Sequence, residues 1–220
     1  MQIIDHIQIS LQEGEVAARL RFDPARAESE NLRDLVSLAQ MLIQLRAIYE
    51  VAYVAGKEKG TVEVAGVSFK SQLLHENLVT ANKVFPYIVT VGPNLERNAV
   101  AQDDLLRQYY LEEIANLALE QAAGWLASNL ASHYGVGRLS NLSPGSLEDW
   151  PITEQPKLFS IFGDTERLIG VRLTESLLMV PRKSISGILF PSEEGFVACQ
   201  LCEREHCQGR KAPFSGTTTA

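Results

Sequence analysis

The longest helical pattern in the chain runs over residues 103–134 and constrains the fold more than any other feature. Paired aspartates at its start, Asp103 and Asp104, favour a helix N-terminus because carboxylates interact well with the partial positive charge there. The apolar side chains wind round one broad face, at Leu106, Tyr110, Ile114, Leu117, Ala118, Ala122, Trp125, Leu126 and Leu130. We therefore predict one long central helix that packs on a sheet.

Shorter helical and strand patterns fill the rest of the chain. Helical spacing of apolar residues occurs at 11–22, 29–45, 71–78 and 151–162. Ser10, with Glu13 three residues later, forms a capping-box pattern before the first of these. Alternating or continuous apolar runs predict strands at 3–9, 47–54, 60–69, 85–91 and 194–200. This order of elements predicts an α+β fold with a twisted, mostly antiparallel sheet.

Composition argues against several classes of protein. The 220 residues are 45% hydrophobic and 21% charged, which is typical of a globular protein with a proper core. A net charge of -7 and the lack of a Lys/Arg stripe argue against a nucleic-acid partner. The N-terminus lacks a basic region followed by an apolar core, and the apolar neighbourhood 114–130 is interrupted by polar residues. We predict a cytoplasmic protein without a membrane span.

Residues 173–190 form the most unusual stretch. They are typical of two strands, 173–180 and 184–190, joined as a hairpin through Pro181, Arg182 and Lys183. Small or polar residues stand where a packed strand prefers bulk, which leaves room for a close approach to the backbone. An irregular loop rich in glycine, proline and serine lies upstream at 135–150, and such loops are often functional. We expect the functional site within reach of this hairpin.

Four segments carry a resemblance to a known family. They are YIVTVGPN at 87–94, the long helix ending near Tyr134, SPGSLEDWPITEQ at 143–155 and LTESLLMVPRKSISG at 173–187. With these segments, residues 1–198 resemble the activation (reactivation) domain of cobalamin-dependent methionine synthase. The resemblance implies that domain's fold, with a mostly antiparallel sheet and one long helix. In the full-length enzyme the domain binds S-adenosylmethionine, docks on the corrinoid domain and permits reductive remethylation of cob(II)alamin.

The resemblance also implies a cofactor site, which is altered in this chain. Where the family has an arginine and a tyrosine around its Ser-Pro-Gly turn, this chain has Asn141 and Ser146. Asparagine replaces the charge-assisted hydrogen bond of an arginine only weakly, and Arg138 can compensate if the loop is rearranged. A family aromatic pair becomes Gly195 and Phe196. The implied cofactor-binding residues are Arg138, Asn141, Ser143, Pro144, Gly145, Ser146, Glu175, Gly195 and Phe196.

All three cysteines lie close together near the C-terminus, at Cys199, Cys202 and Cys207. Two cysteines separated by two residues can hold one metal ion because the intervening turn brings both sulfurs to one side. Three thiols suit an iron–sulfur cluster with one open iron, or zinc, with His206 or an external group as a further ligand. Free thiols without metal are the third alternative. We predict a Cys-rich, metal-binding segment at 199–220, separate from the domain at 1–198.

Three functions agree with these features. The chain has no room for homocysteine, folate or cobalamin modules, so we expect it to act in trans and to meet cobalamin only through a partner protein. The first hypothesis is an accessory protein of corrinoid-dependent methyl transfer, which docks on a corrinoid protein or methyltransferase and assists its reductive reactivation. The second is a methionine synthase-type methyltransferase or reactivase component that binds S-adenosylmethionine. The third is a non-catalytic interaction module stabilised by metal.

Overall fold

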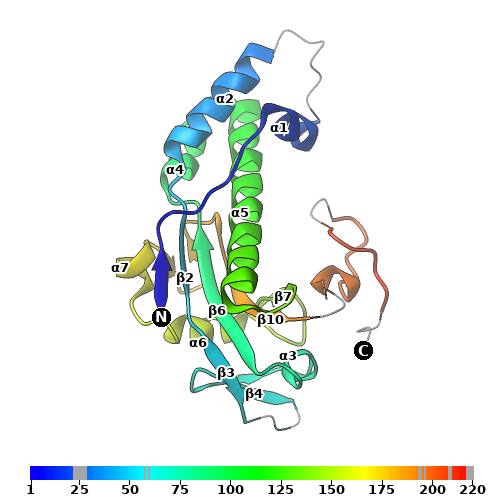
Figure 1. Cartoon of the computed structure of the whole chain (residues 1–220). Helices are drawn as coiled ribbons and strands as arrows, with labels where there is room; N and C mark the ends of the chain where they lie inside the picture. Colours follow the sequence, from blue (N-terminus) through cyan, green and yellow to red (C-terminus); the bar gives the residue numbers. More distant parts are fainter. Residues whose placement is uncertain are drawn as a thin grey trace.

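The predicted central helix is α5 (Leu105–Tyr134) in the computed structural model, which describes residues 1–21, 29–56, 58, 60–192, 195, 197–207 and 210–216. Asp104 is its N-cap, as the paired aspartates predicted, and accepts hydrogen bonds from the backbone N–H groups of Leu106 and Arg107 at 2.8 and 3.4 Å. The helix ends at Gly135, which has a φ of 60°. Figure 1 shows α5 running through the centre of the molecule.

An eight-stranded sheet lies along the C-terminal half of α5 (Figure 1). Its strands are β1 (Gln2–Ile4), β2 (Arg46–Tyr49), β3 (Ala52–Ala55), β4 (Thr61–Val64), β5 (Val67–Lys70), β6 (Lys83–Thr90), β7 (Leu139–Leu142) and β10 (Ser184–Pro191). The central strand is β6, with β2 and β3 along one edge and β10 along the other, all antiparallel. The α+β fold with an antiparallel sheet and a long helix is therefore confirmed.

Alternation along β2 and β6 places core residues on both faces of the sheet. Tyr49 and Tyr87 face α5, where they pack with Leu126 and other side chains of its C-terminal half. Ile48 and Ile88 point to the opposite face. That face is covered by side chains from and next to α6 (Gln155–Ser160), which follows η1 (Ile152–Glu154), and α7 (Thr165–Ile169). The sheet is thus the middle layer between α5 and the short helices.

The N-terminal half of α5 packs against α1 (Glu13–Leu20), α2 (Ser29–Leu42) and α4 (Asn94–Val100), as Figure 1 shows. Their common core includes Val16, Leu35, Leu95 and Ile114. A separate core underlies β3, β4, β5 and α3 (Gln72–Leu78) and contains the buried Trp150. None of the helices in the described part of the chain has both the length and the apolar character needed to cross a membrane.

Two predictions differ from the structure, one because of a long-range contact and one because of local turns. The capping box at Ser10 does not form: α1 begins at Glu13 after Gln12, which makes no side-chain cap. Ser10 instead pairs its backbone N–H and C=O with the side chain of Gln121 on α5, at 3.1 and 3.0 Å. The predicted strands 47–54 and 60–69 are each divided into two, the latter by a turn at Ala65, where φ is 52°.

The predicted hairpin at 173–190 was also wrong. Its first half contains two short strands, β8 (Arg172–Leu173) and β9 (Met179–Val180), which pair with each other around a turn closed by Thr174 and Leu178. Its second half, β10, pairs with β6 and β7 instead. Residues 194–200 form no strand in their described part, where η2 (Ala198–Gln200) is a 3-10 helix. Residues 194 and 196 lie outside the described residues.

Candidate functional site

A groove of about 740 Å³ lies beside β7 and β10. Its walls come from residues 138–146, from η1 and α6, from residues 177–186 and from the C-terminal segment at 197–199 and 211. The loop and the 173–190 stretch, which sequence analysis singled out separately, therefore meet at one site. The volume is typical of small-molecule sites. A larger groove of about 970 Å³ between the N-terminal segment and the end of α2 contains none of the predicted site residues.

Most of the predicted cofactor-binding residues line this groove, namely Arg138, Asn141, Ser143, Pro144, Gly145 and Ser146. Gly195 lies against Arg138, since a Cβ at Gly195 would be 2.7 Å from the guanidinium carbon. Glu175 is exposed in the turn between β8 and β9 and does not line the groove, although Leu177 of the same turn does. Phe196 lies outside the described residues.

Asn141 lines the groove, but its side chain is engaged in a row of hydrogen bonds. Tyr87 donates its hydroxyl hydrogen to Asn141 Oδ1 at 3.1 Å, and Asn141 Nδ2 donates to Ser143 Oγ at 3.1 Å. Burial raises the pKa of the Tyr87 phenol, so the hydroxyl stays a neutral donor. The row passes over Gly187 so closely that a Cβ there would be 2.6 Å from Asn141 Oδ1. Asn141 therefore cannot take the place of a ligand-binding arginine without breaking this row.

Ser146 is likewise used to close a turn. Its backbone N–H and its hydroxyl both donate to the Ser143 carbonyl, at 3.1 and 2.6 Å. The N–H of Gly145 donates to the Trp150 carbonyl at 2.7 Å. Gly145 has a φ of 80° and lies against Ile152, so a larger residue would fit poorly. The Ser143–Ser146 turn is thus a rigid part of the groove wall.

Several lining residues were not among the predicted site residues. Ser140 and Ser186 are buried on neighbouring strands, and neither hydroxyl has a hydrogen-bond partner among the described residues. The Gln155 side chain, 2% exposed, lines the groove. Arg182 and Lys211 supply positive charge. The signal for Ser186 is the presence of Ser184 and Ser186 in a strand whose remaining residues are glycine, proline or apolar.

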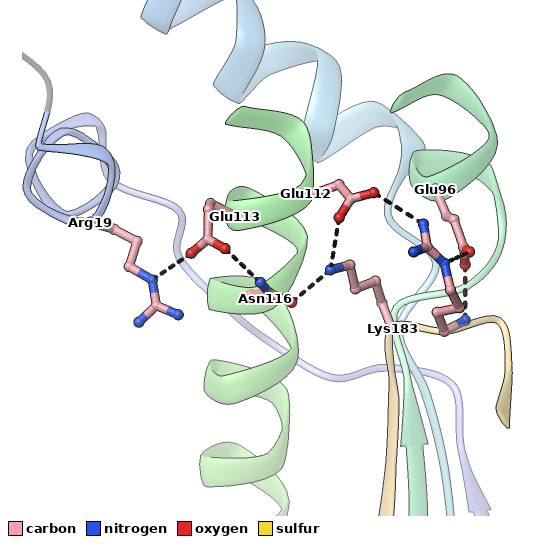
Figure 2. A network of polar contacts seen from close by, with 7 residues as sticks. Arg19, Glu96, Glu112, Glu113, Asn116 and Lys183 are labelled. Carbon is pink, nitrogen blue, oxygen red and sulfur yellow. Dashed lines mark hydrogen bonds and ion pairs between the residues drawn. The ribbon is translucent and has the colours of Figure 1, made fainter. Parts of the chain in front are cut away.

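The residues before β10 are tied to the helical layer by a network of ion pairs and hydrogen bonds. Lys183 Nζ donates to Asn116 Oδ1 at 2.8 Å and lies 3.6 Å from Glu112, while Arg182 pairs with Glu112 and with Glu96 of α4. The contacts shown in Figure 2 continue along α5 to α1, and join Arg19, Glu113, Asn116, Lys183, Glu112, Arg182 and Glu96. The network fixes one wall of the groove to α4 and α5.

The three cysteines lie in a loop beside the groove. All have free thiols; Cys199 lines the groove, Cys202 is half-buried and Cys207 is exposed. The guanidinium of Arg210 donates to the carbonyl oxygens of Cys199 and Cys202, at 3.0 and 3.1 Å, and to that of Arg204. No three His, Cys, Asp or Glu side chains in the described ranges are gathered to hold a metal ion. The loop is thus organised around a guanidinium.

Comparison with known proteins connects this region to a family. Residues 144–209 match the family described as vitamin B12 dependent methionine synthase, activation domain. The crystal structure of the MetH reactivation domain bound to AdoHcy is similar, with a TM-score of 0.56 and 17% identity over 86% of this chain and 70% of that chain. No curated protein matches. The chain is therefore similar to the activation domain of vitamin B12 dependent methionine synthase, in sequence over residues 144–209 and in fold over most of its length.

Proposed function

We propose that this protein docks on a corrinoid protein and assists its reductive reactivation. The observation that carries the proposal is that the segment similar in sequence to the activation domain, residues 144–209, also supplies much of the lining of the groove. An activation domain acts on a corrinoid cofactor held by another domain, so this chain would meet cobalamin through a corrinoid-binding partner.

Exposed apolar side chains near the groove support docking of a protein. Ile152, Leu178 and Val180 are 40%, 61% and 36% exposed, and the first two also line the groove. An apolar patch next to a polar cavity is typical of an interaction surface. Docking here would bring the groove and the corrinoid close together.

The test follows cobalt in a corrinoid protein that starts as cob(II)alamin, with titanium(III) citrate as electron donor. We expect this protein to form a complex and to accelerate appearance of the cob(I)alamin spectrum. Leu178→Glu should weaken both effects because a carboxylate would be buried in the interface. Leu105→Glu, at a residue 79% exposed at the start of α5, is the matched control. Absence of a complex and of any effect on reduction would exclude the proposal.

A second candidate function is binding of an S-adenosyl ligand in the groove. It is favoured by the volume of the groove and by Arg138 at its edge. The related MetH reactivation domain was crystallised with AdoHcy. Calorimetric titration with S-adenosylmethionine and S-adenosylhomocysteine tests this candidate. Micromolar binding that is lost in Arg138→Ala would support it, and absence of heat with either ligand would count against it.

Metal binding by the cysteine segment is a further proposal of ours. Its support is the spacing of Cys199, Cys202 and Cys207 and the partial or full exposure of all three side chains. Thiolates at this spacing suit an iron–sulfur cluster or zinc. Loading would require the loop to rearrange around the metal. Metal analysis and the visible spectrum of protein purified without oxygen separate the alternatives: iron with absorbance near 400 nm, colourless zinc protein, or neither metal.

A further inference from the structure

The charges that line the groove are unbalanced. Arg138, Arg182 and Lys211 line it, and no carboxylate does among the residues that the structure describes. Arg182 is neutralised by Glu96 and Glu112, which lie on its far side. Arg138 and Lys211 have no ion-pair partner in the described part of the chain. In a protein with a net charge of -7, the groove is thus a local site of positive charge.

Two buried hydroxyl groups inside the groove lack partners among the residues that the structure describes. The hydroxyls of Ser140 and Ser186 are buried without a hydrogen bond to any described residue. The side chain of Gln155, 2% exposed, lines the same groove. Polar groups buried in this way are normally paired, by protein, by water or by a ligand. Hydroxyl and amide groups can each donate a hydrogen bond, and anionic oxygens are their strongest acceptors. The interior of the groove therefore offers hydrogen-bond donors to an anion, the same kind of ligand that the cations at its rim would attract.

The remaining lining is apolar. Ile152 and Ile185 contribute to the walls, together with Leu177 and Met179 from the turn between β8 and β9. Sites for small organic molecules combine such walls with a few well-placed polar groups. The ligand should therefore have an apolar body as well as a charge.

We propose that the groove binds a small organic anion, with its carboxylate or phosphate between Arg138 and Lys211, and that it discriminates against sulfonium cations. This inference rests on the proposed function only in taking the groove as the active face of the protein. A sulfonium would approach Arg138 and Lys211, which no described carboxylate neutralises, and would find no described carboxylate to stabilise it, so repulsion would weaken its binding. A ligand with the same body but without the positive charge would avoid that repulsion.

Matched probes test the charge preference on the intact chain. Adenosine 5′-monophosphate and adenosine differ by the phosphate, and S-adenosylhomocysteine and S-adenosylmethionine differ by the methyl group that creates the sulfonium. By calorimetry we expect the monophosphate to bind at least about tenfold more tightly than adenosine, and the thioether more tightly than the sulfonium. The advantage of the monophosphate should fall as salt is raised. Inorganic pyrophosphate serves as an anion without an adenosyl group.

Single substitutions assign the effect to the groove. Arg138→Gln and Lys211→Gln should each lower monophosphate affinity by about tenfold and change adenosine binding by less than about twofold. Arg97→Gln and Lys70→Gln are the controls, because both side chains are exposed and lie off the groove. Gln155→Leu should weaken all adenosyl probes together.

Three results would overturn the inference. The first is absence of saturable binding by both pyrophosphate and the monophosphate. The second is binding of S-adenosylmethionine that equals or exceeds that of S-adenosylhomocysteine. The third is an unchanged charge preference in Arg138→Gln. These results are independent of the corrinoid assay, because docking relies on Leu178 and neighbouring apolar groups. If the protein forms the complex with a corrinoid protein but does not bind anions, this inference is refuted and the proposed function is not.

Discussion

Replacing Gly187 by alanine is the sharpest test of how the groove is built. Gly187 lies in β10, between β6 and the end of β7, and its backbone is covered by the Tyr87–Asn141–Ser143 row. A Cβ at this position would overlap the Leu142 carbonyl oxygen and would lie 2.6 Å from Asn141 Oδ1 and 2.8 Å from Ser143 Oγ. The side chains can turn away from the methyl group, but the carbonyl can move only with its strand.

The cost has two parts. Overpacking by a methyl group costs about 1–3 kcal/mol where the backbone must shift. Turning Asn141 and Ser143 away would break two hydrogen bonds, worth about 1 kcal/mol each. Because β10 is paired on both sides, little of the strain can be relieved by moving it. We expect Gly187→Ala to lower the free energy of unfolding by about 3–5 kcal/mol.

Urea denaturation followed by circular dichroism measures this change, with Gly124→Ala as the control. Gly124 lies within α5 and a Cβ there would meet no atom within 4 Å. That substitution should raise the free energy of unfolding by about 0.5–1 kcal/mol, since alanine favours a helix interior. A Gly187→Ala protein within about 0.5 kcal/mol of the parent would refute the close packing of β7 on β10 described above.

Three further changes test other parts of the structure by the same denaturation measurement. Asp149→Ala removes the carboxylate that accepts hydrogen bonds from the first backbone N–H groups of α3, at 3.3 and 2.9 Å, and should lower the free energy of unfolding by about 1–2 kcal/mol. Asp149→Asn, which keeps an acceptor oxygen, should lower it less. Lys183→Met should cost about 2 kcal/mol, because its side chain is 13% exposed and donates to Asn116, whereas Lys157→Met at a surface pair should cost below about 0.5 kcal/mol. Burial raises the pKa of Tyr87, so the folded protein holds a proton that the unfolded chain loses above about pH 10. Stability should therefore fall as pH rises beyond that value and fall less in Tyr87→Phe; a titration of phenolate absorbance in which Tyr87 ionises normally would contradict this.

Local sequence predicted those elements whose ends are set locally. The position of α5 followed from its length, its apolar face and the cap at Asp104. The strands on either side of Ala65 and Gly66 were harder to delimit, because only Gly66 is a typical turn residue while Ala65 also adopts a positive φ. Ser10 was misread because a partner 111 residues away, Gln121, decides its hydrogen bonds. Such contacts exist only once the chain has folded.

The candidate site also combines residues that are close in sequence with residues that only the folded chain brings together. Arg138 and the Ser143–Ser146 turn, predicted as cofactor-binding residues, line the same groove, and one short segment of the sequence contains them. Gln155 and Lys211 could not be placed beside them, because they approach the groove only after β10 has paired with β7 and the C-terminal segment has folded back. The predicted hairpin also obscured the site: it would have paired β10 with the wrong partner and left Ser186 without neighbours.

The two sides of the groove differ in how firmly they are held. On one side, Ser184 bonds to Thr90 at 2.9 Å while Lys183 and Arg182 join α5 and α4, so this wall moves only with the whole sheet. On the other side, Cys199 lies in η2 and Lys211 in the segment that follows; the guanidinium of Arg210 donates to the Cys199 and Cys202 carbonyls, and the backbone N–H of Lys211 donates to Cys199 Sγ. Any event that displaces Arg210, such as binding of a metal by the cysteines, would therefore move one wall of the groove and leave the other in place. The groove and the cysteine segment are thus best understood as one site, in which the loop sets the position of a cation that we propose binds the ligand.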